Sequence, residues 1–96
     1  MPGWVRKGDA NNVGAPVVGA VAATVIVNGR NAALRGSTIA THVPPAPPVG
    51  PHVMPKIIVG SATVIVENRP PAFLGADESC GHKQAEASGD VIVPGA

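Results

Sequence analysis

The sequence predicts a small all-β domain whose short strands form the three faces of a prism. Three observations lead to this prediction: a repeated strand sequence, a high content of turn residues and a near absence of aromatic side chains. The 96 residues include 12 glycines and 11 prolines, yet 45% of the chain is hydrophobic. Short apolar blocks between glycine and proline turns are typical of all-β domains. Because Trp4 and Phe73 are the only aromatic residues, the core is expected to consist of Val, Ile, Leu and Ala.

The strongest strand signal occurs twice. Residues 23–36 recur as residues 62–75, a shift of 39 positions, and eight of the 14 aligned residues are identical, including the whole Ala-Thr-Val-Ile-Val run. A β-branched run followed by turn residues is typical of a strand and its exit turn. A shorter third copy, Val-Ile-Val, occupies residues 91–93. Three equivalent strands favour a pseudo-three-fold arrangement over a two-fold one.

Taken in order, the chain alternates short extended segments with turns. Residues 17–19 and 23–27 are predicted to be extended, and Asn28-Gly29 is a strong hairpin signal because both residues tolerate positive φ. Residues 31–35 are predicted to be extended or a loop, since their repeat partners Pro70-Pro71 are incompatible with a helix interior. Further short strands are expected at residues 38–41, 56–59, 62–66 and 91–93, and a rigid polyproline-like surface loop at residues 44–48.

Composition argues against several functional classes. The formal net charge is +1, only 14% of residues are charged, and no basic stripe with interleaved aromatics exists, so nucleic-acid binding has little support. The longest apolar stretch, residues 15–27, is interrupted by Pro16 and Gly19 and is shorter than the ~20 residues that span a bilayer. A single cysteine excludes an internal disulfide, which leaves a metal or assembly with a partner as the added source of stability.

Three histidines and one cysteine lie in the two polar, turn-rich segments. His42 and His52 flank the proline loop, and Cys80 and His82 follow the second repeat. Because Thr41 aligns with Cys80 at the repeat shift, we expect both segments to meet at one end of the fold. One thiolate and three imidazoles form a tetrahedral set that zinc accepts. Two alternatives stay open: the residues are solvated or buried without a metal, or Cys80 is a nucleophile with His82 as its base.

Short motifs distributed along the whole chain resemble those of the PAAR-repeat family. Those motifs are Met1-Pro2, Arg6-Lys7-Gly8-Asp9, Gly60-Ser61-Ala62-Thr63-Val64, Arg69-Pro70-Pro71-Ala72 and Cys80-Gly81-His82. The segment Asn31-Ala32-Ala33-Leu34-Arg35 resembles the Pro-Ala-Ala-Arg motif that names the family, with Asn31 in place of Pro and Leu34 inserted before Arg35. The second repeat carries the looser version Pro70-Pro71-Ala72-Phe73, in which the arginine is lost.

The resemblance implies a short, sharp cone that caps the trimeric β-helical spike of a contractile injection machine, either a type VI secretion system or a contractile phage tail. One tip would sit on each trimer and meet the target cell envelope mechanically, without a nucleic-acid partner. It also implies a zinc ion near the apex, with iron as the alternative, held by His42, His52, Cys80 and His82. Such a protein would be assembled in the bacterial cytoplasm and then carried at the distal end of the spike.

The three Val-Ile-Val copies are candidate contacts for the spike trimer, which offers three equivalent exposed edges for strand pairing. The candidate residues are Thr24, Val25, Val27, Thr63, Val64, Val66, Val91 and Val93. The alternative is that these residues only form the core. We expect one domain over residues 1–96, without a fused effector, and a structural rather than an enzymatic role. Two other hypotheses stay open: the protein is an adaptor that attaches a separate effector to the spike, or it is a small metal-dependent hydrolase.

Overall fold

The computed structural model describes residues 2–41 and 54–95. Within these ranges the chain contains short β elements and turns but no helix, which confirms the predicted all-β class. It follows that no helix in these ranges is long and apolar enough to cross a membrane. His42, His52 and the proline-rich segment 44–48 lie outside the described residues.

In the described part of the chain, four short strands form two antiparallel pairs. Strand β1 (Val17–Gly19) pairs with β4 (Thr38–Ile39), and β2 (Ile26–Val27) pairs with β3 (Arg30–Asn31). The turn between β2 and β3 has φ values of 52° at Asn28 and 80° at Gly29, as a type I′ hairpin requires. The hairpin predicted at Asn28-Gly29 is therefore confirmed.

The remaining predicted strands are shorter than the sequence pattern indicates. Residues 56–59, 62–66 and 91–93 form single bridges instead of ladders, because each segment pairs for only one or two residues before it turns onto the next face. The bridges are Thr38 with Lys56, Ile57 with Glu78, Val66 with Arg69, and Gly3 with Ile92.

A closed ring of three backbone hydrogen bonds marks the axis of the fold. Ala33 donates its N–H to Val5 O (2.8 Å), Val5 donates to Ala72 O (3.0 Å), and Ala72 donates to Ala33 O (3.0 Å). All three residues are fully buried. A cycle in which each member both donates and accepts needs three equivalent positions around one axis. The predicted pseudo-three-fold arrangement is therefore confirmed.

The third copy of the repeat is divided between the two ends of the chain. Gly8, Gly36 and Gly75 each lie three residues after a ring member and have φ values of 91°, 93° and 88°. Their N–H groups donate to equivalent buried positions, the carbonyl oxygens of Val17, Ile57 and Gln84. Residues 3–9 thus correspond to residues 31–37 and 70–76, while residues 91–93 supply the Val-Ile-Val strand of the same copy.

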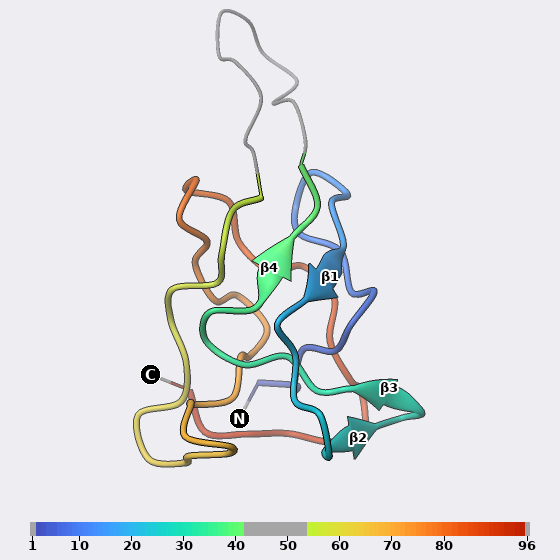
Figure 1. Ribbon diagram of the computed structural model, residues 1–96, viewed down its shortest axis with the longest axis vertical. Helices are drawn as coiled ribbons and strands as arrows, with labels where there is room; N and C mark the ends of the chain where they lie inside the picture. The colour runs from blue at the N-terminus through green and yellow to red at the C-terminus, as the bar shows by residue number, and fades with distance from the viewer. Residues whose placement is uncertain (1, 42–53, 96) are drawn as a thin grey trace, which may run out of the picture.

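The core follows the axis from a broad end to a narrow end. Strands β2 and β3 lie at the broad end, and β1 and β4 lead toward the narrow end (Figure 1). The indole N–H of Trp4 donates to Ala33 O at 2.9 Å, which anchors the only tryptophan to the central ring. Small and β-branched side chains fill most of the rest, as the composition predicts: Val5, Ala15, Val17, Ala22, Val27, Ala32, Ala33, Leu34, Ile39, Ile57, Ala72, Ala76 and Val93.

Candidate metal site and docking face

The loop of residues 76–84 brings Cys80 and His82 to the narrow end of the molecule (Figure 1). Glu78 donates its N–H to His82 O (2.8 Å), and Gly81 donates to Glu78 O (3.0 Å) with a φ of 93°. The positive φ closes the loop tightly, so that glycine is required between the two ligand candidates. The side chains of Cys80 and His82 consequently lie on the same side of the loop.

The loop of residues 9–17 has the same backbone conformation as the loop of residues 76–84 but carries different side chains. Asn11 N–H donates to Ala15 O at 2.9 Å, and Gly14 has a φ of 88°, which reproduces the Glu78–His82 bond and the geometry of Gly81. Val13 and Ala15 stand where the other loop has Cys80 and His82. The fold therefore repeats the loop, and the metal-ligating residue types are confined to one of these two copies.

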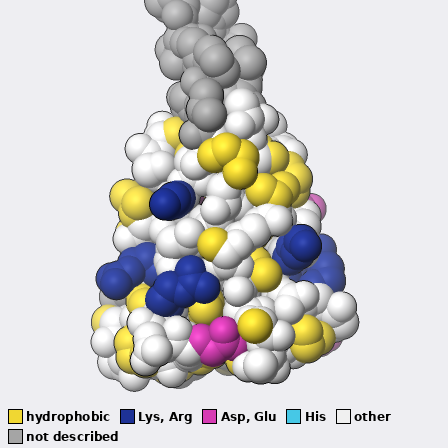
Figure 2. All heavy atoms as spheres, viewed as in Figure 1, with side chains coloured by type: hydrophobic (Ala, Val, Ile, Leu, Met, Phe, Trp, Pro, Cys, Tyr) yellow, Lys and Arg dark blue, Asp and Glu magenta, His cyan; other side chains and the backbone are white. Residues whose placement is uncertain are grey.

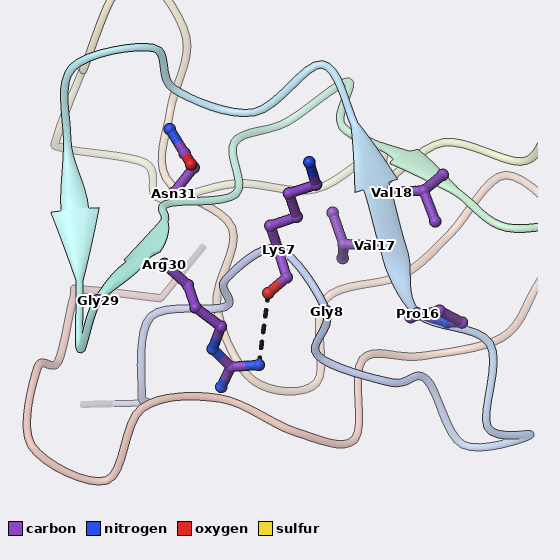
Figure 3. Close-up of a pocket in the computed structure, with 8 residues that line it drawn as sticks. All are labelled: Lys7, Gly8, Pro16, Val17, Val18, Gly29, Arg30 and Asn31. Atoms are coloured by element: carbon purple, nitrogen blue, oxygen red, sulfur yellow. Dashed lines mark hydrogen bonds between the residues drawn. The ribbon is translucent and has the colours of Figure 1, made fainter.

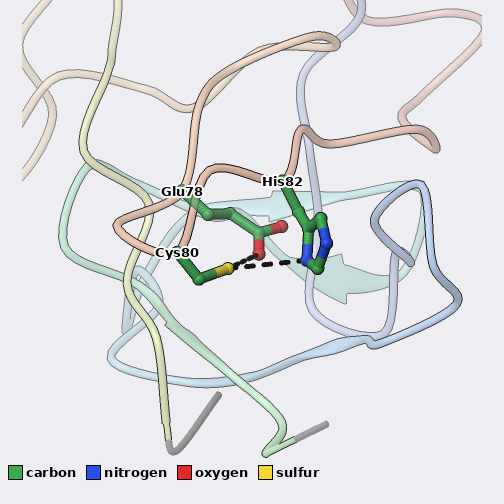
Figure 4. Close-up of side chains that lie close together, drawn as sticks. All are labelled: Glu78, Cys80 and His82. Atoms are coloured by element: carbon green, nitrogen blue, oxygen red, sulfur yellow. Dashed lines mark hydrogen bonds between the residues drawn. The ribbon is translucent and has the colours of Figure 1, made fainter. Parts of the chain in front are cut away.

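Glu78, Cys80 and His82 form a compact cluster of three ligand atoms within 4.8 Å of one another (Figure 4). Cys80 Sγ is 3.6 Å from His82 Nδ1 and 3.4 Å from Glu78 Oε1. Zinc bonds of about 2.3 Å to sulfur and 2.0–2.1 Å to nitrogen, at a tetrahedral angle, separate the two atoms by about 3.6 Å. The thiol and the imidazole thus fit a shared zinc ion. This group could hold a metal ion.

Glu78 is a functional candidate that the sequence analysis missed. Its side chain is 1% exposed, and its carboxylate accepts hydrogen bonds from Asn11 Nδ2 (3.0 Å) and Gln84 Nε2 (2.5 Å). The signal was the spacing Glu78-x-Cys80-x-His82, since alternate residues of an extended segment share a face. Burial raises the pKa of the Cys80 thiol, and the hydrogen bond to Glu78 adds to this increase. A cation at the site would offset both effects.

The chain on either side of residues 42–53 is tied to this loop. Met54 N–H donates to Thr41 Oγ1 (3.1 Å), so the two flanks of the segment are in contact. Lys56 N–H donates to Ser79 Oγ (3.0 Å), and Ser79 N–H donates to Lys56 O (2.7 Å). The structure thus brings together Cys80 and His82 of the predicted ligand set. The participation of His42 and His52 stays a prediction, because both lie outside the described residues.

At the broad end, each Val-Ile-Val copy exposes its central residue. Ile26, Ile65 and Ile92 are 56%, 66% and 54% exposed. Of the predicted spike contacts, Val27 and Val93 are buried in the core, Thr24 and Thr63 are exposed, and Val25, Val64, Val66 and Val91 are partly buried. The three isoleucines were missed, although strict alternation along a strand turns the central residue outward when a flanking valine is buried.

The three copies are joined head to tail around this end. The turn after each copy contacts the start of another: Glu67 accepts from Ala23 N, Thr24 N and Thr24 Oγ1, Asn28 Nδ2 donates to Asp90 Oδ2, and Ala62 N donates to Gly95 O. The hydrogen bond from the Thr24 hydroxyl, with those from the two N–H groups, lowers the pKa of Glu67 below its ordinary value. The segments that carry the three isoleucines therefore form one continuous base at the broad end of the molecule (Figure 1).

The fold and the site together define a class: a small β protein with pseudo-three-fold symmetry, a three-sided base and, at its narrow end, a loop whose side chains could hold a metal ion. Residues 7–95 match the model of the family described as PAAR motif. The chain belongs to the PAAR motif family. Comparison with curated proteins gave no match.

Proposed function

We propose that this protein is the structural tip of the spike of a contractile injection machine, and that it caps the blunt end of a trimeric β-helical spike. Membership of the PAAR motif family supports a spike-tip role. In this proposal the protein performs no catalysis. It sharpens the spike, is assembled in the bacterial cytoplasm and is then carried at the distal end of the spike to the target cell envelope.

The observation that carries the proposal is the three-sided base. The end of a trimer presents three identical edges, and a single chain can contact all three equally only if it repeats one surface three times. Ile26, Ile65 and Ile92 do so, since they occupy equivalent positions and are all more than half exposed. Large apolar side chains that are exposed at one end of a molecule favour a protein contact there. We therefore assign the isoleucines, with Thr24 and Thr63 beside them, to the spike contact.

A structural metal at the narrow end completes the proposal. Cys80 and His82 supply two ligands with the separation that zinc requires, and His42 and His52 complete the set in our proposal. Zinc matches thiolate and imidazole donors better than magnesium or calcium does, and iron is the alternative. When bound, such a metal supplies folding free energy and rigidity. The chain itself contributes the tight loop around Gly81 and the buried carboxylate of Glu78.

Co-expression with a trimeric β-helical spike protein tests the proposal. The wild-type chain should co-purify with the trimer, and a variant carrying Ile26→Asp, Ile65→Asp and Ile92→Asp should not, because three carboxylates cannot be desolvated at an apolar contact. Ile58→Asp is the matched control, since Ile58 is 53% exposed but lies outside the base. Loss of binding in the control as well, or co-purification of the triple variant, would contradict the proposal.

A further inference from the structure

A groove of about 370 Å³ on the flank of the molecule collects three positively charged side chains. It is lined by Arg35, Gly36, Lys56, Ile57, Ile58 and Arg69. Ile58 is 53% exposed and supplies an apolar surface beside the charges. Lys and Arg side chains gather on the flank, above the broad end, in the space-filling view (Figure 2). Since the base and the narrow end are both elsewhere, the groove has no part in the function proposed above.

The pseudo-three-fold axis relates this groove to a second one. The second groove is lined by Lys7, Gly8, Pro16, Val17, Val18, Gly29, Arg30 and Asn31 (Figure 3). In it, Arg30 Nη1 donates to Lys7 O at 3.4 Å, and Arg30 Nη2 pairs with Asp9 Oδ1 at 3.0 Å. Asp9 is 2% exposed and also pairs with Arg6. The arginine of this groove is therefore already paired with a buried carboxylate of the chain, although Asp9 itself lies outside the lining.

The first groove has the same arginine but lacks the carboxylate. Arg69 Nη1 donates to Arg35 O at 3.4 Å, as Arg30 does to Lys7. The position of Asp9 is taken by Ser37, whose hydroxyl accepts from Leu34 N and donates to Ala20 O. With the residues that the structure describes, Arg35, Lys56 and Arg69 form no ion pair.

Glu67 does not take the place of Asp9 in this groove, because it lies outside the lining. The charge of Arg69 makes the smallest contribution to the lowered pKa of Glu67, whose oxygens accept hydrogen bonds from Ala23 and Thr24 and form no ion pair with Arg69. On the third pseudo-equivalent face, Leu74 corresponds to Arg35 and Pro2 to Arg69, so neither cation is present. Among the described residues, only one of the three faces thus combines two arginines that form no ion pair, and it would bind one partner per chain.

We propose that this groove binds an acidic segment of a partner polypeptide, with an Asp or Glu side chain between Arg35, Lys56 and Arg69 and an apolar neighbour on Ile58. The equivalent Arg30 shows which group this geometry accepts, because it pairs with a carboxylate of the chain itself. The planar guanidinium fork matches the two oxygens of a carboxylate. The Arg69 side chain is also preorganised, since its Nη1 packs against Gly36. A β-carbon at Gly36 would lie 3.4 Å from that nitrogen.

Backbone amide NMR of the full ¹⁵N-labelled chain tests the proposal with a blocked peptide, Ile-Asp-Glu-Ala, and its neutral counterpart Ile-Asn-Gln-Ala. We expect the acidic peptide to shift the amides of Arg35, Gly36 and Ile58, and the neutral peptide to leave them unchanged. The variant Arg35→Gln/Lys56→Gln should bind roughly five- to tenfold more weakly, because two exposed ion pairs are lost. Both side chains are exposed, so this variant should fold. Lys7→Gln, the equivalent of Arg35→Gln in the second groove, is the matched control.

Three results would overturn the inference. The first is equal binding of the neutral peptide. The second is a set of shifts distributed equally over the Lys7 groove. The third is that the chain binds phosphatidylglycerol vesicles but not the acidic peptide, and that vesicle binding depends on Arg35 and Lys56. That result would indicate that the groove binds a membrane surface instead. Because no spike protein is present in the assay, its outcome is separate from the test of spike capping.

Discussion

The N–H of Ala62 donates to the carbonyl oxygen of Gly95 at 3.3 Å, which joins the start of the second repeat copy to the end of the third. This bond is the last of three junctions and closes the broad end into a ring. The ring gives one chain three similar faces around its base. The strength of each junction therefore bears directly on how well the base is formed.

The first prediction concerns the two chain ends, which together build the third copy. A β-carbon on Gly3 would lie 2.1 Å from Ser88 O, whereas one on Gly89 would meet nothing within 4 Å. Gly3→Ala should lower the free energy of unfolding by about 1–3 kcal/mol, the usual cost of overpacking. Gly89→Ala should change it little. Urea unfolding measures both, and equal stability of the two variants would show that the ends do not pack as described.

The second prediction concerns pH and Glu67. Its pKa is lowered from the ordinary 4.5, chiefly by the Thr24 hydroxyl, so folding favours the ionised carboxylate. Its contribution to stability is complete above pH 4.5 and is lost as the pH falls through the lowered value. The wild type should melt at a slightly higher temperature than Glu67→Gln at pH 7, and the difference should disappear in acid. The control is the same comparison in a Thr24→Val background. There, a difference in melting temperature between the protein with Glu67 and its Glu67→Gln variant as large as in the wild-type background would contradict the account.

The third prediction concerns the metal. Purified wild-type protein should contain one zinc or iron ion per chain, and both Cys80→Ser and His82→Ala should lose stoichiometric metal. Chelation should lower the melting temperature of the wild type but not of either variant, because the metal supplies folding free energy. Val13→Ser alters the equivalent position of the other loop and should retain the metal. Elemental analysis that finds no metal in the wild type would exclude the site.

The fourth prediction separates Glu78 from the other cluster residues. Glu78→Gln removes the charge beside Cys80 Sγ but keeps the shape of the side chain. Affinity for the metal should fall about 10- to 100-fold, the usual effect of altering a group that orients or balances the ligands. Competition with a chromogenic chelator measures this change. An unaltered affinity would mean that Glu78 serves only to hold Asn11 and Gln84.

Features carried by side chains in local sequence could be predicted. The Val-Ile-Val copies indicated three equivalent faces, and Asn28-Gly29 indicated the hairpin that the φ values confirm. The three histidines and one cysteine in two polar segments indicated a metal site, of which the structure brings Cys80 and His82 together. The first two of these signals each lie within a few residues, where the periodicity of a strand or the φ preference of a residue leaves a direct trace.

Features carried by the backbone could not be predicted. Residues 3–5 have no residue type in common with residues 31–33 at equivalent positions. Their equivalence rests on the backbone hydrogen bonds of Val5, which any residue other than proline can make. The role of Glu78 depends on Asn11, whose contact with it spans 67 positions of the chain. The repeat aligns Arg30 with Arg69, but the difference between their grooves depends on the ion pair of Arg30 with Asp9, which spans 21 positions of the chain.

The most direct test of the central claim is the stoichiometry of the complex with a trimeric β-helical spike, measured by native mass spectrometry. A three-sided base predicts one chain per trimer at every ratio of the two proteins. Complexes with two or three chains bound to one trimer would contradict it, because each spike subunit would then bind its own tip.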